Sequence, residues 1–274
     1  MFTTTLCFGR TISGFPGSFL SCILNLYPFL KSKDLTTISG LVPKTSIMAV
    51  VKASSYGSGK NEIVNLLQYH KVDYLAVAYL DEGVELRKSG IRLPIMIMNP
   101  DINSYETMIR YQLEPEVYSQ NMLDTLLAYL KFNGIEHYPI HLKLDTGMHR
   151  LGFEEKELDS LVDILKQATK EFEIKSILSH LKASDDTSES HACEEQFLLF
   201  DNMYSRIQKS LSITPMKHML NSAGIINYPQ YQYDMVRLGI GLYGIDPSTK
   251  IQSELENVLS LKSRVSQIKN IKGG

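Results

Sequence analysis

The stretch IMAVVKASSYGSGK, residues 47–60, shows the pattern on which the chain is built. Its five apolar residues, from Ile47 to Val51, are enough for a buried strand, and they run directly into Lys52. A turn rich in Gly and Ser follows and carries a single tyrosine, Tyr56. We therefore expect a buried strand that presents a lysine at its C-terminal end, next to a turn of small residues.

The same unit of strand, turn and helix recurs along the chain. Short β-rich apolar runs predict eight strands, at residues 47–52, 74–80, 94–99, 113–119, 139–145, 174–181, 218–223 and 235–244. Helical apolar spacing is clear between many of them, as in residues 61–71, 121–134, 155–172 and 193–211. Strands that alternate with helices pair in parallel, and eight such units favour a closed α/β fold, the (β/α)8 TIM barrel, over an open sheet. The link at residues 224–234 has room for only a short helix.

The two ends of the chain differ from this pattern. Residues 1–40 form an atypical N-terminal segment, which lacks a basic start and is interrupted by Gly14, Pro16 and Gly17, so we do not expect a targeting peptide. The barrel is predicted over residues 41–254. Residues 255–274 alternate apolar and polar side chains, as an antiparallel strand does. We expect this segment to be the start of a truncated C-terminal β domain.

Composition limits the classes of function. The net charge of -2 gives no reason to expect nucleic acid or an anionic membrane as a partner. No apolar run reaches about 18 residues, so no transmembrane helix is expected. The three cysteines lie far apart and in no metal-ligand spacing, which predicts a reduced, cytoplasmic setting and no metal site.

Reactive side chains follow several of the predicted strands. Lys52 ends the first strand, Arg150 lies in LKLDTGMHRLGF (142–153) after the fifth, and His180 lies at the end of the sixth. Because the C-terminal ends of barrel strands share one mouth, these groups should form a basic pocket. Small-residue loops beside cations suit a phosphate-bearing ligand.

A lysine at the end of a buried strand is easily desolvated, which favours the neutral, nucleophilic amine. Together with a phosphate pocket, this points to a covalent link between Lys52 and pyridoxal 5'-phosphate (PLP). Taken singly, the same residues have structural explanations: Lys52 could snorkel to solvent, and His180 could be a satisfied core histidine. Asp145, which precedes Thr-Gly, is predicted to hold its own turn rather than act as a base.

Three ordered motifs make the chain resemble the alanine racemase family. They are AVVKASSYGSG (49–59), LKLDTGMHRLGF (142–153) and the pair NSAG (221–224) and VRLGIGLYG (236–244). The similarity covers roughly residues 45–272. The residues around Lys52, with Ser58 where many members have histidine, are most similar to Bacteroidetes racemases, in which the domain is often fused behind a cell-wall ligase.

The resemblance implies a role for each matching residue that meets the cofactor phosphate or its covalent link. Lys52 would hold PLP covalently and act as one of two bases. Tyr56 would sit by the phosphate. Ser222 and the backbone amides of Gly239 and Ile240 would bind the phosphate oxygens.

It also implies roles around the cofactor ring. Arg150 would reach the phenolic oxygen and help to position the substrate carboxylate, and His180 would pack beside the ring and bond to Arg237. Arg237 would face the pyridine nitrogen. Since arginine does not give up its proton, that nitrogen would stay unprotonated, which favours reprotonation of the substrate over transamination. Lys143 matches a lysine that is carbamylated in many members.

The implied activity is PLP-dependent interconversion of L- and D-alanine for peptidoglycan synthesis, in a homodimer. Racemisation needs a base on each face of the substrate. The family's second base is a tyrosine of the β domain, beyond Gly274, so we expect this chain to bind PLP weakly and racemise poorly. Alternatives are a PLP-homeostasis barrel protein and a non-catalytic PLP-binding remnant. PLP decarboxylases with this barrel fit less well, because they place a carboxylate where Arg237 stands here. The sequence does not separate alanine from serine as substrate.

Overall fold

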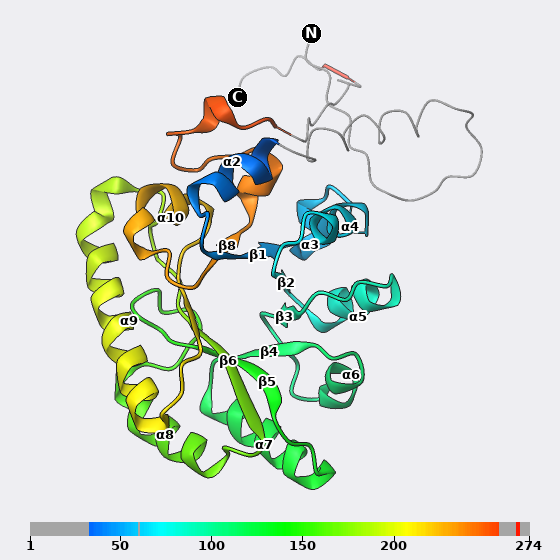
Figure 1. Ribbon diagram of the computed structural model, residues 1–274, viewed down its shortest axis with the longest axis vertical. Coiled ribbons are helices and arrows are strands. Elements are labelled where there is room, and N and C mark those ends of the chain that lie inside the picture. The colour runs from blue at the N-terminus through cyan, green and yellow to red at the C-terminus, as the bar shows by residue number, and fades with distance from the viewer. Residues whose placement is uncertain (1–32, 60, 258–266, 269–274) are drawn as a thin grey trace, which may run out of the picture.

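The computed structural model describes residues 33–59, 61–257 and 267–268 (Figure 1). Most of the atypical N-terminal segment and of the expected strand after residue 255 lies outside the described residues. The strands are β1 (Ser46–Val50), β2 (Tyr74–Val77), β3 (Ile95–Ile97), β4 (Glu114–Val117), β5 (Tyr138–Lys143), β6 (Phe172–Leu178), β7 (Met216–His218) and β8 (Met235–Leu238). The helices are α2 (Lys33–Leu41), α3 (Lys52–Tyr56), α4 (Asn61–Tyr69), α5 (Leu80–Lys88), α6 (Tyr105–Arg110), α7 (Gln120–Asn133), α8 (Leu158–Gln167), α9 (Ser190–Leu211) and α10 (Ser222–Asn227).

The eight strands form one parallel sheet in the order β7-β6-β5-β4-β3-β2-β1-β8. Neighbours in sequence are neighbours in the sheet, and β8 returns to pair with β1, with Met48 opposite Arg237. Backbone hydrogen bonds also join the two outer strands: the Asp234 N–H donates to the Lys217 carbonyl (3.0 Å) and the Arg237 N–H to the Leu220 carbonyl (2.9 Å). The sheet therefore closes on itself, and the (β/α)8 prediction is confirmed.

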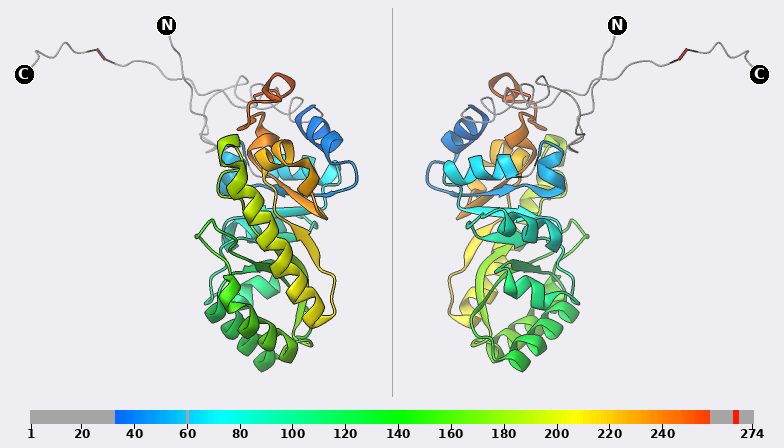
Figure 2. Two further views of the ribbon diagram at one scale, coloured as in Figure 1. Left: turned by 90° about the vertical axis from the view of Figure 1, so that its left-hand side faces the viewer. Right: turned by 90° about the vertical axis from the view of Figure 1, so that its right-hand side faces the viewer.

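The helices lie outside the strands, as the 3.6-residue spacing predicts. Figure 1 shows α4, α5 and α6 along one side and α9 along the other, and Figure 2 shows α9 running along the barrel. Helix α8 buries Leu158, Leu161, Val162 and Leu165, which share one face at helical spacing. Among residues 33–59 and 61–257, no helix is both long enough and apolar enough to cross a membrane.

The interior of the barrel has an apolar and a polar part. Alternate residues of β1 belong to different clusters, because successive strand side chains point to opposite faces. Ile47 and Ala49 pack in the large outer core, whereas Met48 and Val50 pack in a separate cluster with Tyr74 and residues of β2, β3, β6 and β8. Strands β4 to β8 contribute buried polar side chains, which are Glu114, Glu116, His141, Lys143, Ser176, His218 and Arg237. Glu116, Lys143 and Arg237 of this polar part line the cavity described below.

All eight strands end two or more residues before their predicted ends, and three of these differences bear on the site. β1 stops at Val50, before Lys52. β8 stops at Leu238 rather than at residue 244, because Gly239 leads into a 3-10 turn over Ile240–Tyr243. β7 ends at His218, and the chain soon enters α10, whose first turn is capped by the Asn221 side chain accepting from the Gly224 N–H (2.9 Å). The six residues of α10 agree with the short helix expected before the last strand.

Candidate active site

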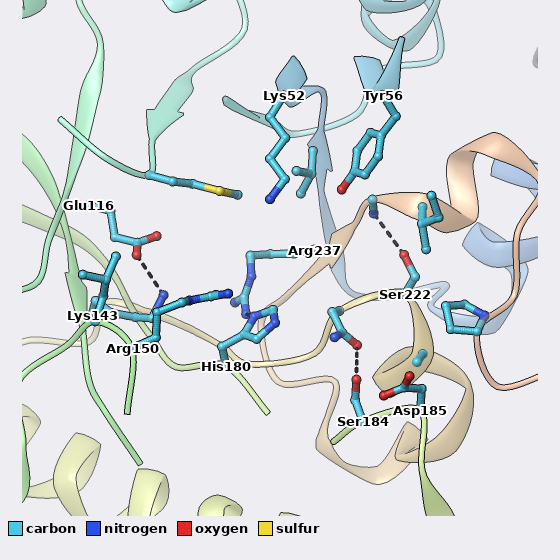
Figure 3. Close-up of a pocket in the computed structure, with 18 of the residues that line it drawn as sticks. Lys52, Tyr56, Glu116, Lys143, Arg150, His180, Ser184, Asp185, Ser222 and Arg237 are labelled. Atoms are coloured by element: carbon cyan, nitrogen blue, oxygen red, sulfur yellow. Dashed lines mark hydrogen bonds and ion pairs between the residues drawn. The ribbon is translucent and has the colours of Figure 1, made fainter. Parts of the chain in front are cut away.

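A cavity of about 650 Å³ opens at the C-terminal ends of the strands (Figure 3). The structure brings every site residue predicted from the sequence to its wall: Lys52, Tyr56, Lys143, Arg150, His180, Ser222, Arg237, Gly239 and Ile240. In Figure 3, Lys52 and Tyr56 reach into the cavity from one side, and His180 and Arg237 lie across from them. The residues come from elements far apart in sequence, so only the closed barrel assembles them.

Lys52 begins a turn of left-handed helix. Ala53, Ser54 and Ser55 have φ between 52° and 55° and ψ between 49° and 53°, and Tyr56 has φ 54°. This is the left-handed region, which costs an L-residue about 1–2 kcal/mol. The turn closes with the Gly57 N–H donating to the Ala53 carbonyl (2.9 Å). It fixes the direction in which the chain leaves β1 and so the place of the Lys52 amine.

The carboxylate of Glu82 holds this turn to the end of β2. One oxygen accepts from the Ala53 N–H (2.6 Å), and the other accepts from the N–H groups of Ala78 (2.8 Å) and Tyr79 (3.2 Å). Glu82 is 9% exposed. A largely buried carboxylate that accepts three backbone hydrogen bonds is a strong constraint. Sequence reasoning missed this residue, since an acidic first turn of a helix is ordinary.

A cradle of backbone amides surrounds Ser222 at the other end of the cavity. The Ser222 hydroxyl oxygen accepts from the N–H groups of Gly239 (3.1 Å) and Gly241 (3.2 Å). These two bonds leave the hydroxyl hydrogen of Ser222 free to donate. A Cβ on Gly239 would lie 2.8 Å from the Tyr56 hydroxyl oxygen, so a side chain at this position would displace the phenol from its place. Burial raises the pKa of Tyr56, which therefore stays a phenol and a donor.

Arg237 is the most firmly held cation of the site. Its Nη1 donates to His218 Nδ1 (2.8 Å), and its Nη2 donates to the carbonyls of Ser179 (2.7 Å) and Met219 (2.9 Å). Burial lowers the pKa of Arg237 to about 10, so the guanidinium stays charged at neutral pH. Its Nε–H has no acceptor among the described residues, and Arg237 lines the cavity.

His180 meets the same guanidinium through its Nδ1, 3.2 Å from Arg237 Nη2. Since arginine only donates, His180 Nδ1 must be the acceptor, and its proton must be on Nε2. Burial, followed by the charges of Arg237 and Lys143, lowers the pKa of His180 well below its usual value. The imidazole is therefore neutral in the folded chain.

A buried ion pair forms the wall beside Arg150. Lys143 Nζ donates to Glu116 Oε1 (2.8 Å), and the two side chains are 9% and 4% exposed. Burial lowers the pKa of Lys143, the charges of Arg237 and Arg150 lower it further, and Glu116 opposes them. Figure 3 shows Arg150 next to this pair. Glu116 is thus a carboxylate among several cations.

Arg150 is carried by a loop that is closed at its base. The Phe153 N–H donates to the Lys143 carbonyl and the Asp145 N–H to the Phe153 carbonyl, each at 2.9 Å. Asp145 accepts from the N–H groups of Gly147 (2.9 Å) and His149 (3.1 Å), so the prediction that it holds its own turn is confirmed. Gly152 has φ +130°, and a Cβ there would lie 2.5 Å from the Asp145 nitrogen.

Glu116 was also missed from the sequence, although a signal was present. Residues 113–119 read LEPEVYS, and strand periodicity places Glu114 and Glu116 on the same face. In a closed barrel that face points either to the helices or to the interior. Two acidic residues on it indicate an interior with cationic partners, which Lys143 supplies.

The family model for the N-terminal domain of alanine racemase matches residues 33–247. The chain belongs to this family. The alanine racemase N-terminal domain therefore accounts for the barrel and for the whole cavity wall described above.

Alanine racemases are also among its similar relatives. The chain is 36% identical over 241 residues to an alanine racemase of Synechocystis sp., covering 85% of this chain and 63% of that protein. An alanine racemase of Clostridium difficile 630, solved in complex with cycloserine, superposes with a TM-score of 0.77 at 30% identity, covering 90% of this chain and 68% of that one. One from Bartonella henselae, described with covalently bound pyridoxal phosphate, gives 0.72 at 26%, covering 86% and 62%. The chain thus spans a little under two thirds of the Synechocystis relative.

Proposed function

We propose that the complete protein is a PLP-dependent alanine racemase. The observation that supports this best is the placement of Lys52, Arg237 and the Ser222 cradle around one cavity. These are an amine for a covalent link, a cation for the ring, and donors for a phosphate. When bound, PLP supplies an aldehyde that links to amines and a ring that withdraws electrons from the substrate Cα.

The residues present fit PLP at two separate points. The Ser222 hydroxyl hydrogen and the Tyr56 phenol are donors beside a glycine that permits close approach, which suits a phosphate. The Nε–H of Arg237, which has no acceptor among the described residues, would be a fixed donor for the ring nitrogen. Because Arg237 keeps its proton, that nitrogen would remain an acceptor, which weakens electron withdrawal and favours return of the proton to Cα.

The remaining groups would bind the substrate and move its proton. The Lys52 amine would take the Cα proton on one face and return it. Arg150 would bind the substrate carboxylate, held in place by the neighbouring Lys143–Glu116 pair. His180, which is neutral and presents its Nε2–H, would pack beside the ring without adding charge. In this proposal Lys143 is either the free ammonium or a carbamate.

We further propose that the complete protein is a cytoplasmic homodimer that supplies D-alanine for peptidoglycan. Inversion requires a second base on the opposite face of the substrate. In the family this is a tyrosine of the partner subunit's β domain. An upstream cell-wall ligase fusion belongs to the same proposal, and the similarity to Bacteroidetes-type racemases is its support.

The experiment is a titration of the chain with PLP, followed by visible absorption and by borohydride reduction with peptide mass mapping. We expect PLP to become fixed to Lys52 in the native chain and not in Lys52→Ala. Lys170→Ala removes an exposed lysine just after α8 and should bind PLP as the native chain does. Labelling of other lysines instead of Lys52 would contradict the assignment.

Proton exchange separates the racemase from a protein that only binds PLP. In D2O, the PLP-loaded chain should incorporate deuterium at Cα of the alanine enantiomer that presents its proton to Lys52, as followed by proton NMR. Racemisation, measured with a D-amino acid oxidase assay, should appear in the full-length product. If both the present chain and the full-length product bind PLP covalently but neither exchanges the Cα proton, a PLP-homeostasis or remnant function is favoured.

A further inference from the structure

A single chain of hydrogen bonds crosses the interior of the barrel. Five neighbouring strands, β4 to β8, each contribute one side chain to it: Glu114, His141, Ser176, His218 and Arg237. All five are buried, with exposed fractions between 0% and 8%. Barrel interiors are usually filled with branched apolar residues, so a polar chain of this length needs a reason.

Every link in the chain is short. Arg237 Nη1 is 2.8 Å from His218 Nδ1, and His218 Nε2 is 2.8 Å from the Ser176 hydroxyl oxygen. That oxygen is 2.7 Å from His141 Nδ1, and His141 Nε2 is 2.9 Å from Glu114 Oε2. These distances are those of good hydrogen bonds. Both imidazoles are therefore engaged through both of their ring nitrogens.

The chemistry of the two ends sets one direction for all the bonds. Arginine can only donate, so His218 Nδ1 must accept and His218 Nε2 must carry the proton. His218 then donates to Ser176, whose hydroxyl hydrogen is left for His141 Nδ1. His141 consequently donates from Nε2 to Glu114.

Starting from the other end gives the same result. An ionised carboxylate only accepts, so Glu114 also requires the proton of His141 on Nε2. Burial and the charge of Arg237 lower the pKa of His218 well below its usual value, which keeps that ring neutral and able to accept. The cation and the carboxylate thus agree on one arrangement of the protons between them.

We propose that Glu114, His141 and Ser176 are positioning residues that hold Arg237 in place for its ligand. The chain fixes Nη1 through His218, and the Ser179 and Met219 carbonyls fix Nη2. The guanidinium plane cannot turn without breaking these bonds, and only Nε–H remains for the cavity. That this ligand is the PLP ring rests on the proposed function, whereas the direction of the hydrogen bonds does not.

The first test needs no cofactor. Long-range 1H–15N correlation spectra of the PLP-free chain, labelled at histidine, report which ring nitrogen carries the proton. We expect the Nε2–H form for both His141 and His218, assigned with His141→Gln and His218→Gln. Protonation of His218 on Nδ1, or of either ring on both nitrogens at neutral pH, would overturn the proposal.

The second test cuts the chain in its middle. Ser176→Ala removes two buried hydrogen bonds and leaves His218 Nε2–H and His141 Nδ1 without a partner. We expect PLP affinity to fall about tenfold, because Arg237 is then held less firmly. Ser176→Thr keeps the hydroxyl and should restore the affinity. Tyr204→Phe is the matched control: it removes another buried hydroxyl bond, to the Pro215 carbonyl (2.7 Å), away from the cavity.

The outcomes separate the two proposals. If Ser176→Ala and Tyr204→Phe bind PLP equally well while both stay folded, the row of hydrogen bonds from Glu114 to Arg237 has no positioning role and this inference is wrong. Equal affinity of Ser176→Ala and Ser176→Thr leads to the same conclusion. If the native protein binds no PLP but shows the expected histidine protonation, the proposed function fails and the direction of the hydrogen bonds stands.

Discussion

The Glu82 carboxylate lies 2.6 Å from the backbone nitrogen of Ala53, the residue that follows Lys52. The same carboxylate bonds the N–H of Ala78 at the end of β2 (2.8 Å). Two neighbouring strand ends are thereby tied together at the point where the candidate cofactor lysine leaves the barrel. The place of the Lys52 amine consequently depends on a residue thirty positions further along the chain.

Replacing Glu82 with Gln should loosen this point. Glutamine has one oxygen where glutamate has two, so its NH2 group would face a backbone N–H and one bond would be lost. We expect PLP capture by Lys52 to fall about tenfold, as measured by absorption titration. Asp73→Asn is the control, because Asp73 accepts from the Ile47 N–H (2.8 Å) at the opposite end of β1. Equal losses in both variants would argue against a specific role for Glu82.

Removing one partner of the buried Lys143–Glu116 pair should destabilise the fold. Glu116→Gln would leave the Lys143 ammonium buried close to other cations, and we expect a loss of about 3 kcal/mol in the free energy of unfolding. Urea unfolding followed by circular dichroism measures it. Adding Lys143→Met should recover part of the loss, because no unpaired charge would remain.

The exposed pair Arg110–Glu106 provides the comparison. Its side chains are 66% and 72% exposed, so Glu106→Gln should change stability by less than about 0.5 kcal/mol. A loss in Glu116→Gln as small as this would show that Lys143 is already neutral, or modified, in the folded chain.

Mild acid should destabilise the chain through its buried histidines. The folded-state pKa values of His180 and His218 lie well below 6.5, the value expected in the unfolded chain. Between the two values the unfolded chain binds more protons, so stability falls as pH drops below 6.5 and is unaffected above it. Each histidine contributes up to about 1.4 kcal/mol per pH unit.

Urea unfolding at pH 7.0, 6.0 and 5.5 measures this slope. His191→Gln removes a histidine whose side chain is 89% exposed and should leave the slope unchanged. His218→Gln should reduce the slope. This variant starts from a lower stability, because Ser176 and Arg237 lose their hydrogen bonds to the imidazole. A slope near zero in the native chain would mean that both histidines are solvated or already charged.

A side chain at Gly152 should disrupt the loop that carries Arg150. The added Cβ of Gly152→Ala would lie 2.5 Å from the Asp145 nitrogen, at φ +130°, so the loop must open. We expect a loss of about 3 kcal/mol or more, measured by thermal or urea unfolding. Gly90→Ala meets nothing within 4 Å at φ +86° and should cost only about 1–2 kcal/mol of backbone strain. Similar losses of stability in the two variants would mean that the left-handed backbone conformation, and not the contact with Asp145, causes the destabilisation.

The architecture and the membership of the site could be predicted from the sequence because both depend on repeated local patterns. Apolar runs, helical spacing and chemistry at strand ends indicate a barrel with one mouth, and the structure confirms the closed eight-stranded sheet. Lys52, Arg150 and His180 were predicted to share this mouth, and they do. The motifs also identified Ser222 and Arg237.

What the sequence did not indicate was set by contacts between distant residues. The strand expected to run to Lys52 ends at Val50, because Glu82 and the left-handed turn redirect the backbone. Glu114 and Glu116 share a face in any strand, but only the closed barrel shows that this face meets His141 and Lys143. The alternation marks the acidic face of the strand, but the identity of its partners on β5 leaves no local signature.

The left-handed turn at residues 53–56 has a consequence for protein engineering. Ala-Ser-Ser-Tyr does not favour this conformation by itself, since no residue in it is glycine. A designer who grafted the lysine motif onto another barrel would transfer the amino-acid sequence without its backbone conformation, and the amine would point elsewhere. The portable unit is the motif together with an acidic residue in the first turn of the helix after the next strand, Glu82 of α5 in this chain, so a search for similar sites in designed barrels should use both.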